Sequence, residues 1–291
     1  MTYETRCGAL LDYAPCTYGT SRLSFRGPNA ELTEWSVAAI GGSSTYGRFV
    51  ERPYPNRLAG FLQVPVLNLG CQNAGPDAFL ADPVLEETCA LAAATVVEVT
   101  GAINLSNDLY KVHPRRVHPR RNDRFLSATP ALHAVCPGLD LTDVHFTGHL
   151  MSRIRARASD SFPVVVRILQ QAWTDAMCRL VDRSLGPVIL LWFSDMAPPP
   201  DCGALPDLSA HHGRPWFVTQ EMVEQVARRA AAYVECVVTS VPTQDNTPGL
   251  SYSEFEAPIA RRILPPRAHQ EAAQKLEVVV REFLPRLRQR P

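Results

Sequence analysis

Short apolar runs recur along the chain and predict the strands of a buried sheet. Each run is rich in branched aliphatic residues and is bounded by Gly, Pro or polar residues, which is typical of parallel strands covered on both faces. The five predicted strands are residues 36–41, 65–70, 95–100, 188–193 and 233–241.

Segments with helical spacing lie between and after these runs. Residues 163–183 place an apolar side chain at every third or fourth position, on one stripe: Val166, Leu169, Trp173, Met177 and Leu180. Further helices are predicted over 219–231 and about 268–287. Strands that alternate with helices indicate right-handed crossovers. The predicted fold is therefore α/β, a three-layer α/β/α sandwich with a five-stranded, mainly parallel sheet of flavodoxin-like type.

Two long stretches interrupt this alternation. Residues 105–162 form a predicted lid-like insertion after the third strand, and residues 197–215 form a Pro-rich loop after the fourth. Because no linker divides the chain, we expect residues 1–291 to form one domain. In open α/β sheets ligands bind beyond the carboxyl ends of the strands, where both stretches emerge.

Composition excludes several classes of protein. Equal numbers of basic and acidic residues, 29 of each, argue against a dedicated nucleic-acid binder. We expect a cytoplasmic protein that does not enter a membrane, because the N-terminus does not read as a secretory signal and no apolar run is long enough to span a bilayer. The eight cysteines include no C-x-x-C pair, so we expect reduced core thiols and neither metal nor cofactor. The sequence does not predict the oligomeric state.

The segment AAIGGSSTYG, residues 38–47, carries the candidate chemistry. It has no lysine beside its serines, as a P-loop needs, and it lacks the G-x-G-x-x-G of a dinucleotide loop. The remaining pattern is a serine, Ser43, presented at the end of the first strand.

The chain resembles the SGNH/GDSL hydrolase superfamily, in which four sequence blocks follow one another in a fixed order. The resemblance is to a divergent, little-characterised bacterial branch of that superfamily. The resemblance covers roughly residues 35–110 and 185–287. The blocks are Gly41–Thr45 for G-D-S-x-T, residues 66–77 for the glycine turn, Gly101–Asn104 for G-x-N-D, and Pro266–His269 for D-x-x-H.

The resemblance implies a serine-dependent hydrolase that acts on an ester or acetyl group of a small molecule or carbohydrate. Ser43 is then the nucleophile and His269 its general base. The backbone N–H of Ser43, Asn73 and the amide of Asn104 are the implied oxyanion hole.

Some positions depart from the family pattern and leave alternatives open. Gly42 replaces the aspartate of the first block, and Pro266 replaces the carboxylate that orients the histidine. The alternatives for orienting His269 are a carboxylate from Asp195, Glu254 or Glu256, or a backbone carbonyl. Ser44 is the alternative nucleophile, and Asn107 is the alternative amide donor. The alternative function is a non-catalytic ligand-binding protein or an acyltransferase.

Basic residues gather in the predicted insertion. Residues 111–124 contain six Lys and Arg against one acid and include a tandem VHPRR repeat. Arg115, Arg116, Arg120 and Arg121 are candidate anion-binding residues, since guanidinium groups bind anions in bidentate fashion. The alternative is a solvated charged loop.

Overall fold

A five-stranded parallel sheet forms the centre of the protein, for which the computed structural model describes residues 11–112, 124–201, 214–238 and 248–284. Its strands run in the order β2 (Val66–Gly70), β1 (Val37–Gly41), β3 (Ala94–Glu98), β6 (Val188–Ser194) and β7 (Ala232–Val237), and every neighbouring pair is parallel. All five predicted strands are present, so the predicted fold class is confirmed.

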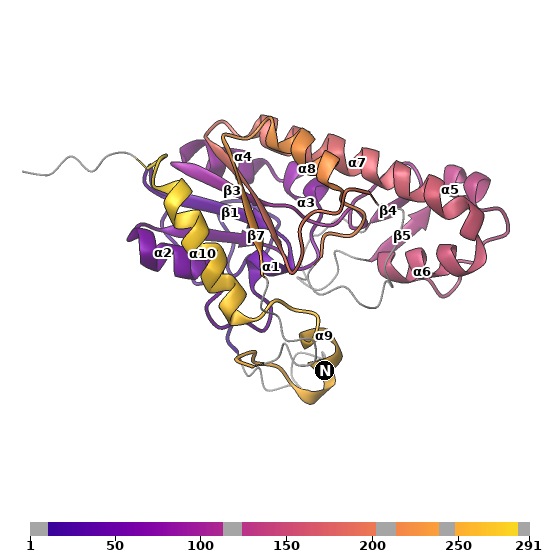
Figure 1. Ribbon diagram of the computed structural model, residues 1–291, viewed down its shortest axis with the longest axis horizontal. Coiled ribbons are helices and arrows are strands. Elements are labelled where there is room, and N and C mark those ends of the chain that lie inside the picture. The colour runs from indigo at the N-terminus through magenta and orange to yellow at the C-terminus, as the bar shows by residue number, and fades with distance from the viewer. Residues whose placement is uncertain (1–10, 113–123, 202–213, 239–247, 285–291) are drawn as a thin grey trace, which may run out of the picture.

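Helices cover both faces of this sheet, which makes three layers (Figure 1). Helices α2 (Tyr54–Leu62) and α10 (Pro266–Val280) pack on one face. The other face carries α3 (Pro76–Leu80), α4 (Pro83–Leu91), α7 (Phe162–Arg183) and α8 (Gln220–Ala227). Alternate residues of each strand enter the two cores because side chains of a strand point to opposite faces. The predicted apolar stripe of α7 is buried.

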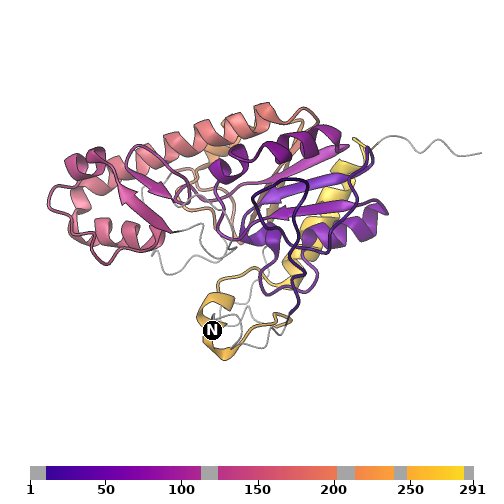
Figure 2. The same cartoon turned by 180° about the vertical axis from the view of Figure 1, so that it is seen from behind.

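The residues that follow β3 build an extension at one end of the molecule. It contains the antiparallel pair β4 (Tyr110–Val112) and β5 (Phe125–Ala128), then α5 (Pro130–Val135), α6 (Thr147–Arg157) and the short helix η2 (Ser159–Ser161). Figures 1 and 2 show these elements together beside the first half of α7. The action of this extension as a lid stays a prediction. The organisation of residues 1–291 as one domain also stays a prediction.

The chain before β1 is fastened to the loop that follows α1 (Ser43–Tyr46). Arg26, only 3% exposed, donates from its guanidinium to the backbone carbonyls of Tyr46, Gly47, Val50 and Glu51, at 2.9–3.4 Å. The guanidinium also lies 4.8 Å from the ring centre of Tyr13. A single buried guanidinium thus donates hydrogen bonds to four backbone carbonyls in this part of the chain.

The remaining described helices are short. The 3-10 helix η3 (Glu254–Glu256) leads into α9 (Ala257–Ala260), and both lie between β7 and α10 in the chain. Among the described helices, none has the length and apolar character that crossing a bilayer requires.

Candidate active site

The candidate site lies where the first and third strands end side by side. The chain leaves β1 toward β2 on one side and leaves β3 toward β6 on the other, and such a switch point opens a crevice at the carboxyl edge of an α/β sheet. A cavity of about 210 Å³ occupies this place. The polar side chains on its wall are those of Ser43, Ser44, Asn73, Glu98, Thr100, Asn104 and Arg214.

Ser43 and Asn73 make two hydrogen bonds with each other. The backbone N–H of Asn73 donates to Ser43 Oγ at 3.0 Å, and the Ser43 hydroxyl donates to Asn73 Oδ1 at 3.1 Å. Asn73 has a φ of 56°, in the left-handed region that Asn tolerates better than most residues. This backbone conformation aims its N–H group at the serine oxygen, where an oxyanion donor is expected.

Asn104 also borders the cavity. Its Oδ1 accepts a hydrogen bond of 2.6 Å from the Thr147 hydroxyl, so its amide N–H groups are the donors left for other partners. Asn107 is used differently, because its Oδ1 accepts from the backbone of Leu109 and Tyr110 at 2.8 and 3.2 Å. It shapes a turn and does not line the cavity. Of the two predicted amide donors, Asn104 is the one at the site.

Glu98, the last residue of β3, holds the turn that carries Ser43. Its Oε2 accepts from the backbone N–H groups of Gly42 and Thr45 at 3.0 and 2.9 Å and from the Thr45 hydroxyl at 2.5 Å. The Ser44 hydroxyl also bonds to this carboxyl group. Gly41 has to be glycine, because a Cβ there would collide with the Glu98 carboxylate and the Thr45 hydroxyl.

Burial raises the pKa of Glu98, against the opposing effect of these hydrogen bonds. Glu98 belongs to none of the sequence motifs. A charged side chain inside the apolar run TVVEVT was the available signal, since a buried strand has no ordinary place for it.

His269 does not join this group. It is fully buried in the core between α2, α10 and the sheet, with its ring stacked on Tyr54 and edge-on to Phe193 at 5.1 Å. Its Nδ1 accepts the backbone N–H of Tyr54 at 3.1 Å, and its buried Nε2 has no hydrogen-bond partner. Burial, with Arg57 and Arg26 nearby, lowers its pKa to about 3. The expected Ser43–His269 pair is therefore not formed in this structure.

The carboxylates expected to orient His269 are also engaged elsewhere. Asp195 pairs with Arg214, and Glu256 caps Ser253 and lies 3.5 Å from Arg48. Glu254 is exposed on η3. None of the described hydrogen bonds or ion pairs joins these acids to His269. Arg115, Arg116, Arg120 and Arg121 lie outside the described residues.

Arg214 brings a positive charge to the cavity wall. Its Nε and Nη2 donate to the two carboxylate oxygens of Asp195 at 2.8 and 3.3 Å. Arg214 is not among the site residues predicted from the sequence, because it lies far from the motifs and near the end of the Pro-rich loop.

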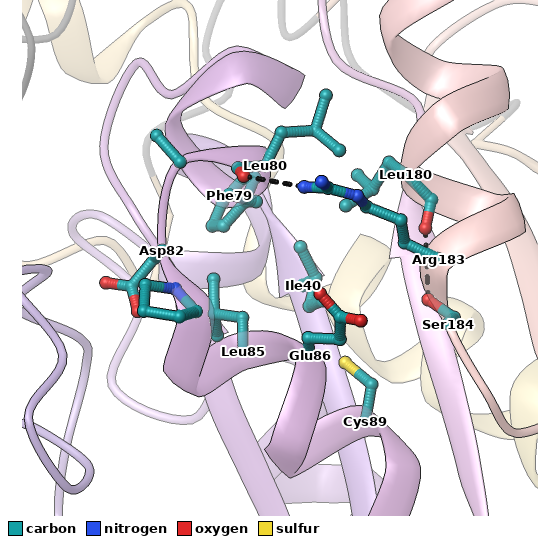
Figure 3. Close-up of a pocket in the computed structure, with 12 residues that line it drawn as sticks. Ile40, Phe79, Leu80, Asp82, Leu85, Glu86, Cys89, Leu180, Arg183 and Ser184 are labelled. Carbon is teal, nitrogen blue, oxygen red and sulfur yellow. Dashed lines mark hydrogen bonds between the residues drawn. The ribbon is translucent and has the colours of Figure 1, made fainter.

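A second cavity of similar size lies away from this edge, between α3, α4 and α7 (Figure 3). Its wall is mostly apolar, with Phe79, Leu85 and Leu180 among the lining residues. The Arg183 guanidinium turns to the backbone carbonyl of Leu80 at 3.1 Å. The thiol of Cys89 on this wall is 2% exposed and its pKa is raised to about 11 by burial, so it is not a nucleophile. The cavity at Ser43 is the better candidate for catalysis.

Comparison with known proteins places the chain in a family. Residues 1–284 match the model described as Domain of unknown function (DUF6473). The chain belongs to this family. No curated protein matches the DUF6473 chain.

Solved structures resemble the DUF6473 chain only distantly. The lipase Lip_vut3 from a goat rumen metagenome is 13% identical, with a TM-score of 0.42, and the match covers 84% of this chain and 96% of the lipase. A catalytic mutant of Axe2, an acetylxylan esterase from Geobacillus stearothermophilus, is 10% identical with a TM-score of 0.42, covering 86% and 95%. BT4096, a gut microbial diltiazem-metabolizing enzyme, is 12% identical with a TM-score of 0.34, covering 88% and 48%.

Proposed function

We propose that this DUF6473 protein is a serine-dependent hydrolase of SGNH type, which acts on an ester or acetyl group of a small molecule or carbohydrate. One observation carries the proposal: Ser43 Oγ stands at a cavity, 3.0 Å from the backbone nitrogen of Asn73, with the Asn104 amide on the same wall. When the serine attacks a carbonyl, the former carbonyl oxygen becomes an oxyanion beside Ser43 Oγ, and donors on this wall can stabilise it there. We also retain the predicted cytoplasmic location as part of this proposal.

The proposed reaction has the usual two halves. Ser43 Oγ bonds to the acyl carbon, the carbonyl electrons move to the oxygen, and that oxyanion faces the Asn73 N–H and the Asn104 amide. The alcohol then leaves with a proton, and water hydrolyses the acyl-Ser43 ester.

The proton of Ser43 needs an acceptor. His269 is unsuited in its described position, since its Nδ1 is occupied by Tyr54 and its Nε2 carries the proton of the neutral ring. Glu98 is the one carboxylic acid among the residues that line the cavity. Its described hydrogen bonds go to Gly42, Ser44 and Thr45, so a proton from Ser43 would reach it through a hydroxyl group or a water molecule. With this position on the wall and its raised pKa, Glu98 is our candidate for the acid–base role.

A fluorophosphonate probe tests the proposal directly. Wild-type protein should be labelled, with the adduct on the peptide that contains Ser43, and Ser43→Ala should abolish labelling. Ser44→Ala is the matched control, because Ser44 is adjacent on the same turn, and it should still be labelled. A folded wild-type protein that resists the probe, or labelling that survives Ser43→Ala, would refute the proposal.

The buried position of His269 favours a second candidate, in which the same cavity binds a polar ligand without hydrolysing it or transfers an acyl group to an alcohol. A non-catalytic protein should bind the ligand but resist the probe. An acyltransferase should form acyl-Ser43 and release it only when an acceptor alcohol is added. Mass spectrometry of the intact protein after exposure to an activated ester distinguishes these outcomes.

A further inference from the structure

Arg214 has the geometry of a group that holds an anion. A guanidinium has five N–H donors in one plane, and the Nε–Nη2 edge of Arg214 is occupied by Asp195. The other edge points in a different direction and suits a second oxyanion. Because Asp195 directly follows β6, the ion pair fixes the guanidinium plane relative to the sheet.

The segment that carries Arg214 is tied to the loop after β3. The backbone N–H of Ala102 donates to the carbonyl of Trp216 at 2.8 Å. A Cβ on Gly101 would lie 2.9 Å from the backbone nitrogen of Trp216, so only glycine allows this approach. Arg214 is therefore held next to the residues that follow β3, including Thr100 and Asn104.

Thr100 is a further polar residue on this wall whose hydroxyl lacks a partner. Thr100 is 8% exposed and lines the cavity. Its buried hydroxyl oxygen has no hydrogen-bond partner. Buried hydroxyl groups are nearly always paired, and each exception calls for an explanation. A carboxylate bound to Arg214 would place an acceptor on the same wall as Thr100 and would leave the Asn104 amide to the oxyanion.

We propose that this wall of the cavity binds a carboxylate of the substrate, so that the favoured substrates are esters carrying a free carboxylate. This inference rests on the proposed hydrolase function. Because Asp195 already offsets part of the charge of Arg214, a planar monoanion fits better than a phosphate dianion, which would bring two negative charges to a single guanidinium. The charge defines the substrate class, while Ser43 performs the reaction.

Two chromogenic esters test the assignment. Mono-p-nitrophenyl succinate and p-nitrophenyl butyrate share a leaving group and a chain length and differ in the terminal carboxylate. With self-hydrolysis subtracted, wild type should prefer the succinate by kcat/KM. Arg214→Gln should lower the succinate-to-butyrate ratio by about 10–100-fold, as expected when a charge-assisted hydrogen bond is lost.

Matched variants separate this effect from a general loss of structure. Arg229→Gln breaks another Arg–Asp pair, with Asp182 at 2.6 Å on the surface, and should leave the ratio unchanged. Thr100→Val should lower the ratio by about 3–10-fold without lowering Tm, because its hydroxyl has no partner in the protein to lose. An unchanged ratio in Arg214→Gln, or an equal fall in Arg229→Gln, would overturn the inference.

A binding measurement keeps this inference distinct from the proposed function. Succinamate, which has one free carboxylate and an amide in place of the ester, should raise the Tm of wild type more than that of Arg214→Gln, while butyramide, which lacks the carboxylate, should raise neither. If wild type cleaves neither ester and resists the fluorophosphonate, the hydrolase proposal fails, while this Tm difference still supports the carboxylate site. Equal Tm shifts in both proteins would overturn the carboxylate site even if both esters are cleaved.

Discussion

Glu98 Oε2 accepts a hydrogen bond of 3.0 Å from the backbone N–H of Gly42, the residue immediately before Ser43. The same oxygen accepts from Thr45, two residues beyond the serine. A side chain at the end of β3 therefore determines the shape of the turn at the end of β1. The position of the nucleophile depends on this acid as much as on its own strand.

Replacing Glu98 should affect both activity and stability. Glu98→Gln removes the titratable group and should lower kcat by about 10²–10⁴-fold, the usual contribution of an acid–base residue. Glu98→Ala should in addition lower the free energy of unfolding by at least about 3 kcal/mol, because the N–H groups of Gly42 and Thr45 and the Thr45 hydroxyl lose their acceptor. Steady-state kinetics and urea unfolding measure the two effects.

The exposed Glu87 on α4 provides the control, and Glu87→Gln should change neither quantity. The pH profile distinguishes a proton-transfer role from a positioning role. A Glu98→Gln enzyme with a reduced rate but an unshifted acidic limb would show that Glu98 only positions the turn.

Asn73 tests whether the oxyanion donor belongs to the backbone. Asn73→Gly keeps the N–H and relieves the left-handed conformation, so kcat/KM should fall less than about tenfold, well short of the 10²–10³ expected when a donor is lost. Gln63→Gly is the matched control, since Gln63 has a φ of 58° at the end of α2. Gln63→Gly should gain stability in thermal unfolding, Asn73→Gly should gain less because it loses the hydrogen bond from the Ser43 hydroxyl, and only Asn73→Gly should alter activity. A loss of 10³-fold in Asn73→Gly would assign the donor role to the side chain.

His269 should make the protein less stable in mild acid. Its pKa lies near 3 when folded and about 6.5 when unfolded, so the unfolded state binds the extra proton between these values. Its contribution is complete above about pH 6.5 and is lost progressively as the pH falls toward 3. Between pH 7 and 5, the free energy of unfolding should drop by about 2 kcal/mol more in wild type than in His269→Gln.

Glutamine is chosen because its side-chain oxygen can still accept the Tyr54 N–H. Glu98 does not mimic the result: its pKa is raised, so its own contribution has the opposite sign and is common to both proteins. Identical pH dependence in the two proteins would contradict a buried, neutral His269.

Arg26 should be among the residues most sensitive to replacement. Arg26→Met leaves four backbone carbonyls without their donor and should lower the free energy of unfolding by about 3 kcal/mol or more, which corresponds to a Tm lower by roughly 6–12 °C. Arg22→Met, at an exposed position nearby, should change stability by less than about 0.5 kcal/mol. Differential scanning calorimetry of both variants checks this expectation.

The sequence predicts the sheet well because buried parallel strands leave a local signal. Runs such as VAAIG in β1 and ATVVE in β3 are apolar on both faces, whatever their neighbours are. Motif order also leads to Ser43, Asn73 and Asn104, which the structure places on one cavity. These residues follow strands directly, so their location is set by short stretches of chain.

The rest of the site depends on contacts across the fold. Nothing local shows that Glu98 reaches the turn after β1, or that Arg214 meets Asp195 from a distant loop. His269 illustrates the opposite case, because its motif position suggests the sheet edge while helix α10 turns the ring into the core. Its hydrogen bond comes from Tyr54, 215 positions earlier in the chain.

The anchoring of Arg26 limits how far the protein can be shortened from its amino end. Although the sheet begins at Val37, the preceding polypeptide supplies the cation that closes the loop behind the nucleophile turn. Grafting the sheet and its helices alone into another protein would transfer Ser43 without the hydrogen bonds of Arg26. The smallest transplantable unit of this site therefore starts upstream of the first strand, at or before Tyr13, whose ring covers the guanidinium.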